Sequence, residues 1–228
     1  MKIAICGTYS SGKTTTSLAL SYFTGIEMTH ALTMREILPK IFPGKRLEFC
    51  SPDEVIELIF QRMIDRVKNE IECEENFISD GASIQEWAYC FPRTIYGMNP
   101  AETKIDDPEI LNGLDSFKKT IDAYGKMAME YAKTHYDVFV HLPVEFPLSP
   151  DGHRPVSEAF RNCCDELLRQ AYQLLGIPVI EVKGDIAQRL TEAVKKLNLN
   201  CTMDIQQAIE IAEEEVRKRF HNVKLETS

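Results

Sequence analysis

The sequence lacks the paired cysteines of a disulfide framework or a zinc knuckle. Its seven cysteines are an odd number, and no two of them form a Cys-x-x-Cys pair. Disulfide-stapled domains and structural zinc sites both depend on such paired spacing. We therefore expect the cysteines to be reduced and mostly structural.

The sequence also lacks long apolar runs and an excess of positive charge. No apolar stretch approaches the ~18 residues that a membrane-spanning helix needs, and the first residues enter a short strand-like run without a signal-peptide pattern. The formal net charge is −9, whereas broad binding to nucleic acid or to a membrane surface needs a basic face. These absences predict a cytoplasmic protein with no nucleic-acid and no membrane partner, in which any anion site is local.

The composition provides enough apolar material for one large domain. The chain has 228 residues, of which 44% are hydrophobic and 27% are charged. These values are typical of a globular domain with a sizeable core. Apolar runs of strand length alternate with stretches of helical periodicity, which predicts an α/β fold.

Residues 7–14, Gly-Thr-Tyr-Ser-Ser-Gly-Lys-Thr, organise the chain. They fit the phosphate-binding pattern of Gly, any four residues, Gly, Lys and then Ser or Thr. An apolar run at 2–6 predicts a buried strand before the loop, and a helix is predicted from about Gly12 to Phe23. In such a loop, successive backbone N–H groups and the positive end of the helix face a phosphate.

The motif predicts a nucleotide site with bound Mg²⁺. Lys13 would reach the β- and γ-phosphates, where it is a candidate catalytic residue, and the Thr14 hydroxyl would bind Mg²⁺. The predicted nucleotide-binding residues in this region are Gly7, Ser10, Ser11, Gly12, Lys13, Thr14 and Thr15.

Residues 76–81, Asn-Phe-Ile-Ser-Asp-Gly, predict a short strand that ends at Asp80. Because the carboxyl ends of parallel strands meet at one edge of a sheet, we expect Asp80 to lie on the same edge as the phosphate loop. There it would bind Mg²⁺ or accept the proton of an attacking hydroxyl group as a catalytic residue. The alternative role is a helix cap for residues 82–88, and both roles are compatible.

A long helix is predicted after Ser51-Pro52-Asp53-Glu54, because this run combines a capping serine, a proline at the first helical position and a glutamate three residues after the cap. Apolar residues recur behind it at helical spacing, and we interpret them as packing rather than chemistry. The predicted inward stripe is Ile56, Ile59, Phe60, Met63, Ile64, Val67 and Ile71, with Glu57, Arg62, Lys68 and Glu72 facing water.

Other residues are candidate substrate contacts. Arg35 follows a short predicted strand at 26–29, and its alternative role is that of a solvated arginine on a helix surface. Residues 91–112 predict a long loop or short helices, a kind of segment that often shapes a pocket. Within it, Arg93 and Tyr96 are the best candidates, whereas the aromatic side chains of Trp87, Tyr89 and Phe91 are predicted to pack.

Residues 143–155 carry prolines at 143, 147, 150 and 155 and contain Asp151-Gly152-His153-Arg154. This segment is too polar for a core and too rich in proline for a helix. An arginine beside glycine, just before a helix, suits a lid that folds over a triphosphate, and a solvated turn is the alternative. Arg161 could add a second cation. Further along, Lys183-Gly184-Asp185 follows the last predicted strand, where backbone groups could hold a purine.

A final helix is predicted from about Met203. Its apolar stripe must pack on the body of the protein or on a second subunit, so a homodimer is possible. We divide the chain into a domain at 1–198 and a helical extension at 199–228 that packs on the same domain. The stripe consists of Ile205, Ile209, Ala212 and Val216.

The phosphate loop, the strand end at Asp80 and the Asp-Gly-x-Arg segment together resemble the single-domain kinases related to ribosylnicotinamide kinase, in the AAA-type P-loop NTPase group. Thymidylate and deoxynucleoside kinases are similar at a greater distance. The resemblance covers about residues 1–198. It implies a three-layer sandwich of about five parallel strands flanked by helices, Mg²⁺-ATP as the donor, and a small acceptor between Asp80 and the lid. It also implies that Arg154, a candidate catalytic residue, and Arg161 contact phosphate.

The chain departs from that pattern after the strand-end acid, where nucleoside and nucleotide kinases tend to have arginine and this chain has Gly81. An arginine there would hold a substrate phosphate. Its absence favours an uncharged acceptor, such as a nucleoside-like or sugar-like alcohol, unless Arg35 or Arg93 restores the charge.

The sequence therefore predicts an ATP-dependent kinase of a small metabolite. A nucleoside monophosphate kinase is one alternative. A nucleotide-regulated ATPase switch that binds a protein partner is another, although the chain has no Asn-Lys-x-Asp run for guanine.

Overall fold

A sheet of five parallel strands, in the order β2-β3-β1-β4-β5, forms the centre of the computed structural model. The structure describes residues 1–73, 75–100, 102–148 and 157–226, with the backbone alone for Arg35 and residues 220–226. The predicted parallel sheet is confirmed. Its strands are β1 (Lys2–Gly7), β2 (Met28–His30), β3 (Phe77–Asp80), β4 (Val138–Leu142) and β5 (Val179–Glu181).

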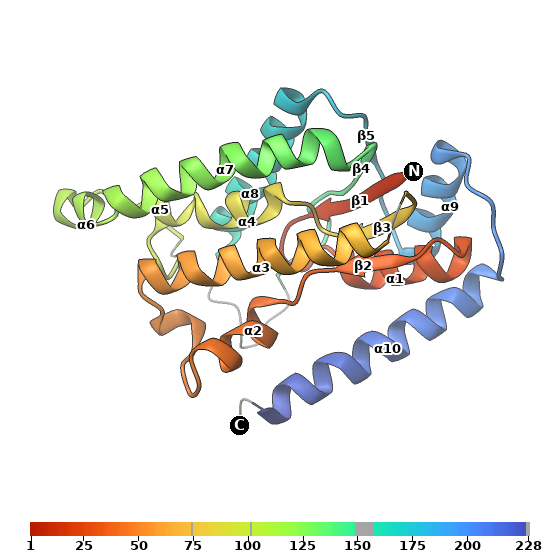
Figure 1. Cartoon of the computed structure of the whole chain (residues 1–228), viewed down its shortest axis with the longest axis horizontal. Helices are drawn as coiled ribbons and strands as arrows, with labels where there is room; N and C mark the ends of the chain where they lie inside the picture. The colour runs from red at the N-terminus through yellow and green to blue at the C-terminus, as the bar shows by residue number, and fades with distance from the viewer. Residues whose placement is uncertain (74, 101, 149–156, 227–228) are drawn as a thin grey trace.

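Helices cover both faces of this sheet, as the predicted three-layer sandwich requires (Figure 1). Helices α3, α4, α7 and α8 pack on one face, and α1, α9 and α10 pack on the other. None of the described helices is both long enough and apolar enough to span a membrane. The helices are α1 (Lys13–Thr24), α2 (Met34–Ile41), the 3-10 turn η1 (Leu47–Phe49), α3 (Pro52–Glu72), α4 (Ile84–Cys90), α5 (Arg93–Tyr96), α6 (Pro108–Gly113), α7 (Asp115–His135), α8 (Glu158–Leu175), α9 (Ile186–Leu197) and α10 (Ile205–Glu226).

Strand β1 illustrates why the sheet is covered on both sides. Its side chains alternate between the two faces, as in any strand. Ala4 and Cys6 pack in the cluster that contains α3 and α7, whereas Ile3 and Ile5 pack in the cluster that contains α1 and α9. All of them are fully buried. A continuous apolar run is therefore the pattern that a central parallel strand needs.

The start of α3 is as predicted, but its buried face is not. Ser51 caps the helix by accepting a hydrogen bond from the Glu54 backbone N–H at 3.3 Å. In turn, the Glu54 carboxylate accepts a hydrogen bond from the Ser51 N–H at 2.7 Å. The predicted inward stripe is partly wrong, because Ile71 is 64% exposed while the side chain of Arg66 is only 2% exposed. Phe60 and Ile64 are also exposed. The predicted water-facing Arg62 is instead mostly buried.

The buried face of α3 differs from the predicted one because α3 packs an ion pair against β3. Glu70 accepts hydrogen bonds from the hydroxyl groups of Ser79 at 2.7 Å, Tyr136 at 2.8 Å and Tyr131 at 2.9 Å. The Arg66 guanidinium donates to the same Ser79 oxygen at 2.9 Å and lies 3.4 Å from Glu70. Burial, followed by the charge of Glu70, raises the pKa of Tyr136 well above its usual range. The pair is therefore buried with its polar atoms satisfied, which is the condition for burying charge at tolerable cost.

Helix α10 runs back along α1 and ends beneath α2 (Figure 1). Ile209 and Ala212 are buried with Ala19 of α1, so the predicted apolar stripe packs on the body of the same chain. The Tyr22 hydroxyl also donates to Glu215 at 2.6 Å.

Replacing Glu70 tests the buried network. Glu70→Ala removes the nearer of the two carboxylates of Arg66, so we expect a loss of about 3–5 kcal/mol in the free energy of unfolding, measured by urea denaturation. Glu72→Ala, on the exposed side of the same helix, should change it by less than about 0.5 kcal/mol. A loss at Glu70 as small as that at Glu72 would contradict this account.

Candidate active site

The phosphate loop joins β1 to α1 and leaves the start of that helix open. Gly7 has φ +149°, and a Cβ atom there would lie 2.6 Å from the Leu142 carbonyl oxygen, so only glycine fits. No side chain caps α1, and its first turn carries no acidic residue. The first helical N–H groups, which include that of Thr15, have no intrahelical partner and are donors for an anion.

Lys13 lies inside the loop and is already oriented. Its ammonium group donates to the Thr8 carbonyl at 2.7 Å and to the Tyr89 hydroxyl at 3.1 Å. The Tyr89 ring stacks on Tyr9, with 4.4 Å between the ring centroids. The aromatic pair and the carbonyl therefore hold the charge of Lys13 at the loop.

Helix α4 braces the loop from the side. The Gln85 amide and the Tyr89 hydroxyl both donate to the Gly7 carbonyl, each at 2.9 Å. Burial raises the pKa of Tyr89 well above its usual range, which keeps the hydroxyl protonated. The sequence predicted only a packing role for Tyr89. The spacing of Gln85 and Tyr89, one helical turn apart, was the available signal.

Asp80 reaches the loop from the carboxyl end of β3, as predicted. Its carboxylate accepts a hydrogen bond from the Thr14 hydroxyl at 2.7 Å. The alternative of a cap is not what the structure shows, since α4 begins after Ser83 without a side-chain cap. Thr14 and Asp80 thus present two hard oxygen ligands at one point, of the kind that Mg²⁺ prefers. Among the described residues, no group of three or more His, Cys, Asp or Glu could hold a metal ion.

Gly81 follows Asp80 in a turn whose backbone conformation favours glycine. It has φ +92°, and a Cβ atom would lie 2.7 Å from Gln85 Oε1 and 3.1 Å from Arg66 Nη2. Arg66 in turn donates to the carbonyl of Gly81 at 3.2 Å. An arginine at this position would therefore strain the backbone, and Arg66 is a cation that contacts the turn instead.

A second ion pair lies between the end of β2 and α4. Arg62 is 2.9 Å from Glu86 and also donates to the Leu32 carbonyl. Glu86 is buried, and Arg66 approaches it at 3.9 Å. Together with Glu70, these residues form a group of two arginines and two glutamates whose opposite charges balance. None of these four was predicted to have a role in the site.

On the other side of the loop lies a hollow of about 250 Å³. Arg189 of α9 lines it, donating to the Ser11 carbonyl at 2.6 Å and to Glu145 at 3.0 Å. Glu145 also accepts from the Gly184 N–H at 3.0 Å. Sequence reasoning placed Gly184 here but missed Arg189, which resembles any other charged residue of an amphipathic helix. The hollow is lined by Ser10, Ser11, Gly12, Phe146, Gly184, Asp185, Ile186 and Arg189.

The predicted lid falls largely outside the described residues. Residues 151–154, including Arg154, belong to the part that the structure does not describe. Arg161, predicted to contact phosphate, donates to the Phe146 carbonyl at 2.6 Å and lies 3.1 Å from Glu158. It therefore holds the first part of the 143–155 segment, ahead of residues 151–154.

The candidate substrate residues lie in two short helices, with Arg35 in α2 and with Arg93 and Tyr96 in α5. Arg93 is buried, donates to the Met98 carbonyl and lies 5.7 Å from the centre of the Phe160 ring. Tyr96 packs edge-on against the same ring. The backbone of Arg35 lies in the first turn of α2, and its side chain is outside the described atoms.

Known proteins share this architecture. A family model described as an AAA domain matches residues 2–189, and a search of curated proteins found no match. The structure of deoxyadenosine kinase from M. mycoides with bound dATP is similar with a TM-score of 0.55 and 18% identity, covering 87% of this chain and 100% of that chain. Its structure with the products dCMP and dCDP has the same TM-score, 0.55, at 19% identity, covering 87% of this chain and 98% of that chain.

The NadR protein in complex with NAD and AMP-PNP is similar with a TM-score of 0.51 and 15% identity. That alignment covers 86% of this chain and 48% of the NadR chain. At these identities the likeness shows the fold, which is that of the predicted P-loop kinase group. Because the family model matches most of the sequence, the chain belongs to the AAA domain family of P-loop proteins.

Proposed function

We propose that the protein is an ATP-dependent kinase that phosphorylates the hydroxyl group of a small, nucleoside-like or sugar-like metabolite. The contact of 2.7 Å between Thr14 and Asp80 carries the proposal. It unites a phosphate loop with an acid from the neighbouring strand, and phosphoryl transfer needs both at one point. The fold, which is shared with P-loop kinases, supports the same conclusion.

The donor side of the site fits ATP. The uncapped start of α1 offers backbone N–H groups to the phosphates, and Lys13 offers an ammonium group next to them. The base would enter the hollow between Phe146 and the Gly184 loop. Thr14 and Asp80 would hold Mg²⁺, which neutralises phosphate charge when bound.

Asp80 has two compatible roles. Its carboxylate would bind Mg²⁺ or accept the proton of the attacking hydroxyl group, and its contact with Thr14 at the phosphate loop supports both roles. Arg154, from the predicted lid, would stabilise the transferred phosphoryl group. Arg161 supports this role indirectly, because it holds Phe146, which precedes that segment in the chain.

Charge balance favours an uncharged acceptor. The described arginines beside Asp80, Arg62 and Arg66, are paired with Glu86 and Glu70, so they offer little positive charge to a substrate phosphate. A nucleoside monophosphate would need a cation that these pairs do not provide. Arg35, Arg93 and Tyr96 are the residues that we propose to contact the acceptor, and a substrate phosphate bound by Arg35 or Arg93 is the alternative that the acceptor screen tests.

An acceptor screen tests the function. Formation of ADP from ATP would be followed with nucleosides, their monophosphates and other small alcohols, and the phosphorylated product would be identified by mass. We expect unphosphorylated alcohols to stimulate ADP formation. Preference for monophosphates would support a nucleoside monophosphate kinase, and stimulation by a protein partner alone would support an ATPase switch.

Lys13→Ala tests the donor site. Loss of the ammonium group should weaken ATP binding and lower the transfer rate at least ~100-fold, or about 2.7 kcal/mol, measured by ATP titration and steady-state kinetics. Lys126→Ala, an exposed lysine of α7, is the matched control. Unaltered turnover in the Lys13 variant would rule out this use of the phosphate loop.

Asp80→Asn tests the acid. Asparagine keeps an oxygen that can accept from Thr14, so we expect little change in the melting temperature, whereas turnover should fall by ~10²–10⁴-fold. The Mg²⁺ dependence of ATP binding separates metal binding by Asp80 from its role as a proton acceptor. This dependence should become weaker in the variant only if Asp80 binds the metal. Asp106→Asn, in an exposed loop, is the control. Near-native turnover in the Asp80 variant would remove Asp80 from the mechanism.

A further inference from the structure

Helix α10 lies beyond residues 2–189, the part matched by the family model. Its first half packs on α1 through Ile209 and Ala212, and its second half continues to α2 (Figure 1). Packing on α1 accounts for the first half alone. The second half therefore needs a separate explanation, and its contact with α2 provides one.

We propose that α10 is a working part of the acceptor side of the site, because Arg219 positions the β2–α2 corner (residues 28–41) beside Asp80. The proposal rests on the proposed function in one respect, which is that this corner faces the acceptor. Arg219 acts through Glu36, so it is a positioning residue.

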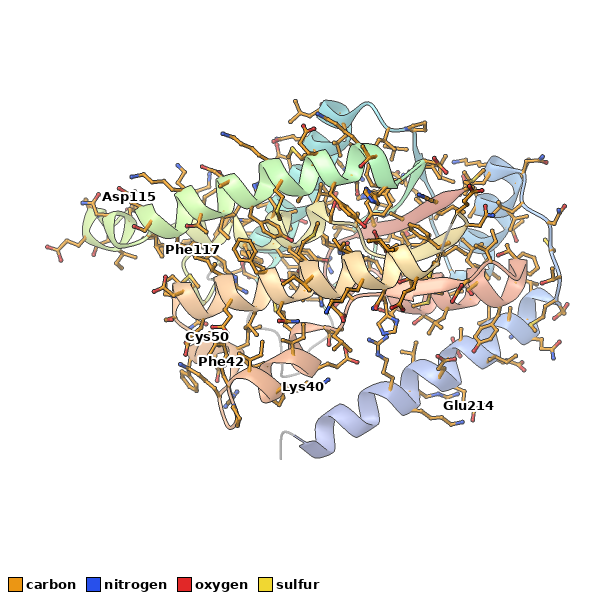
Figure 2. The ribbon with its side chains drawn as sticks, in the orientation of Figure 1. Lys40, Phe42, Cys50, Asp115, Phe117 and Glu214 are labelled. Atoms are coloured by element: carbon orange, nitrogen blue, oxygen red, sulfur yellow. The ribbon has the colours of Figure 1, made fainter. Side chains whose placement is uncertain are left out.

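The ion pair between Arg219 and Glu36 has the geometry of a specific contact. Arg219 Nε lies 2.9 Å from Glu36 Oε1, and Nη2 lies 3.0 Å from Oε2, so the pair is bidentate. The two side chains are only 18% and 14% exposed. By contrast, Lys218 and Glu214 of the same helix form a pair that is 73% and 60% exposed. Figure 2 shows Glu214 on the side of α10 that faces away from the body. Bidentate, sheltered pairs contribute more than exposed ones.

Glu36 transmits this contact to the start of α2. Its Oε2 atom accepts a hydrogen bond from the Thr33 N–H at 2.6 Å and completes the capping box of the helix. Burial favours the neutral acid, but hydrogen bonds from Arg219 and Thr33 outweigh it and lower the pKa of Glu36 to about 2. The carboxylate is therefore charged at any working pH. One side chain joins α10 to the first turn of α2, which also contains Arg35.

The corner that Arg219 holds is next to Asp80. His30, the last residue of β2, is the register partner of Asp80 in the parallel sheet. Helix α3 holds the corner from the other side, since Asn69 donates to the His30 carbonyl at 2.7 Å and Asp65 accepts from the Leu32 N–H at 2.6 Å. The corner is thus fixed between α3 and α10. Loss of the α10 contact should loosen it without disturbing the phosphate loop.

A mutant cycle with hydrogen exchange tests the contact. The variants are Arg219→Gln, Glu36→Gln and their double, and glutamine at position 36 preserves a capping box. In each single variant, we expect amide hydrogen exchange in peptides from residues 28–41 to be about fivefold faster than in the parent protein, equivalent to about 1 kcal/mol. The double variant should exchange little faster than either single variant, because the two single variants break the same ion pair. Lys218→Gln and Glu214→Gln, which break the exposed pair, should leave these peptides unchanged.

Steady-state kinetics with the acceptor found in the screen test the role. In Arg219→Gln we expect the KM for the acceptor to rise about fivefold, with kcat and the KM for ATP within about twofold of the parent. Arg219→Lys should restore part of the loss. Unchanged exchange at 28–41, a uniform increase along the chain, or losses confined to kcat and ATP binding would each overturn the proposal. The exchange measurement needs neither ATP nor acceptor, so it decides on the contact even if the kinase proposal fails.

Discussion

The buried ion pair between Arg66 and Glu70 is the interaction on which the site depends. Arg66 donates to Ser79 and to the Gly81 carbonyl, which are the residues on either side of Asp80. A buried arginine is tolerated only when its hydrogen bonds and its charge are satisfied. Glu70 and the strand-end groups meet that condition together. The ion pair therefore fixes the turn that presents the acid, and it also explains why the turn contains glycine.

The phosphate loop is held from both layers of the sandwich. Helix α4 binds the Gly7 carbonyl through Gln85 and Tyr89, and helix α9 binds the Ser11 carbonyl through Arg189. These contacts use backbone carbonyls, so the N–H groups at the start of α1 stay available for phosphate. Such preorganisation suits a reaction that depends mainly on positioning and electrostatics.

Local sequence was sufficient for most of the fold and for the position of the phosphate loop between β1 and α1. Short apolar runs identified the strands, and Ser51 marked a helix start that the structure confirms. The phosphate loop is a contiguous motif, so its spacing carries the geometry. Asp80 could be placed because strand ends in a parallel sheet converge on one edge. These features depend on neighbours in the chain, so local patterns were enough to predict them.

Tertiary structure alone decided which charged side chains are buried and what they touch. Periodicity placed exposed Ile71 on the inner face of α3, because it cannot show that β3 offers Arg66 and Glu70 a polar surface. Contacts such as Arg189 with Ser11, or Arg219 with Glu36, join residues that are 178 and 183 positions apart. No local pattern encodes such partners. Their energetics depend on burial and geometry, which exist only once the chain has folded.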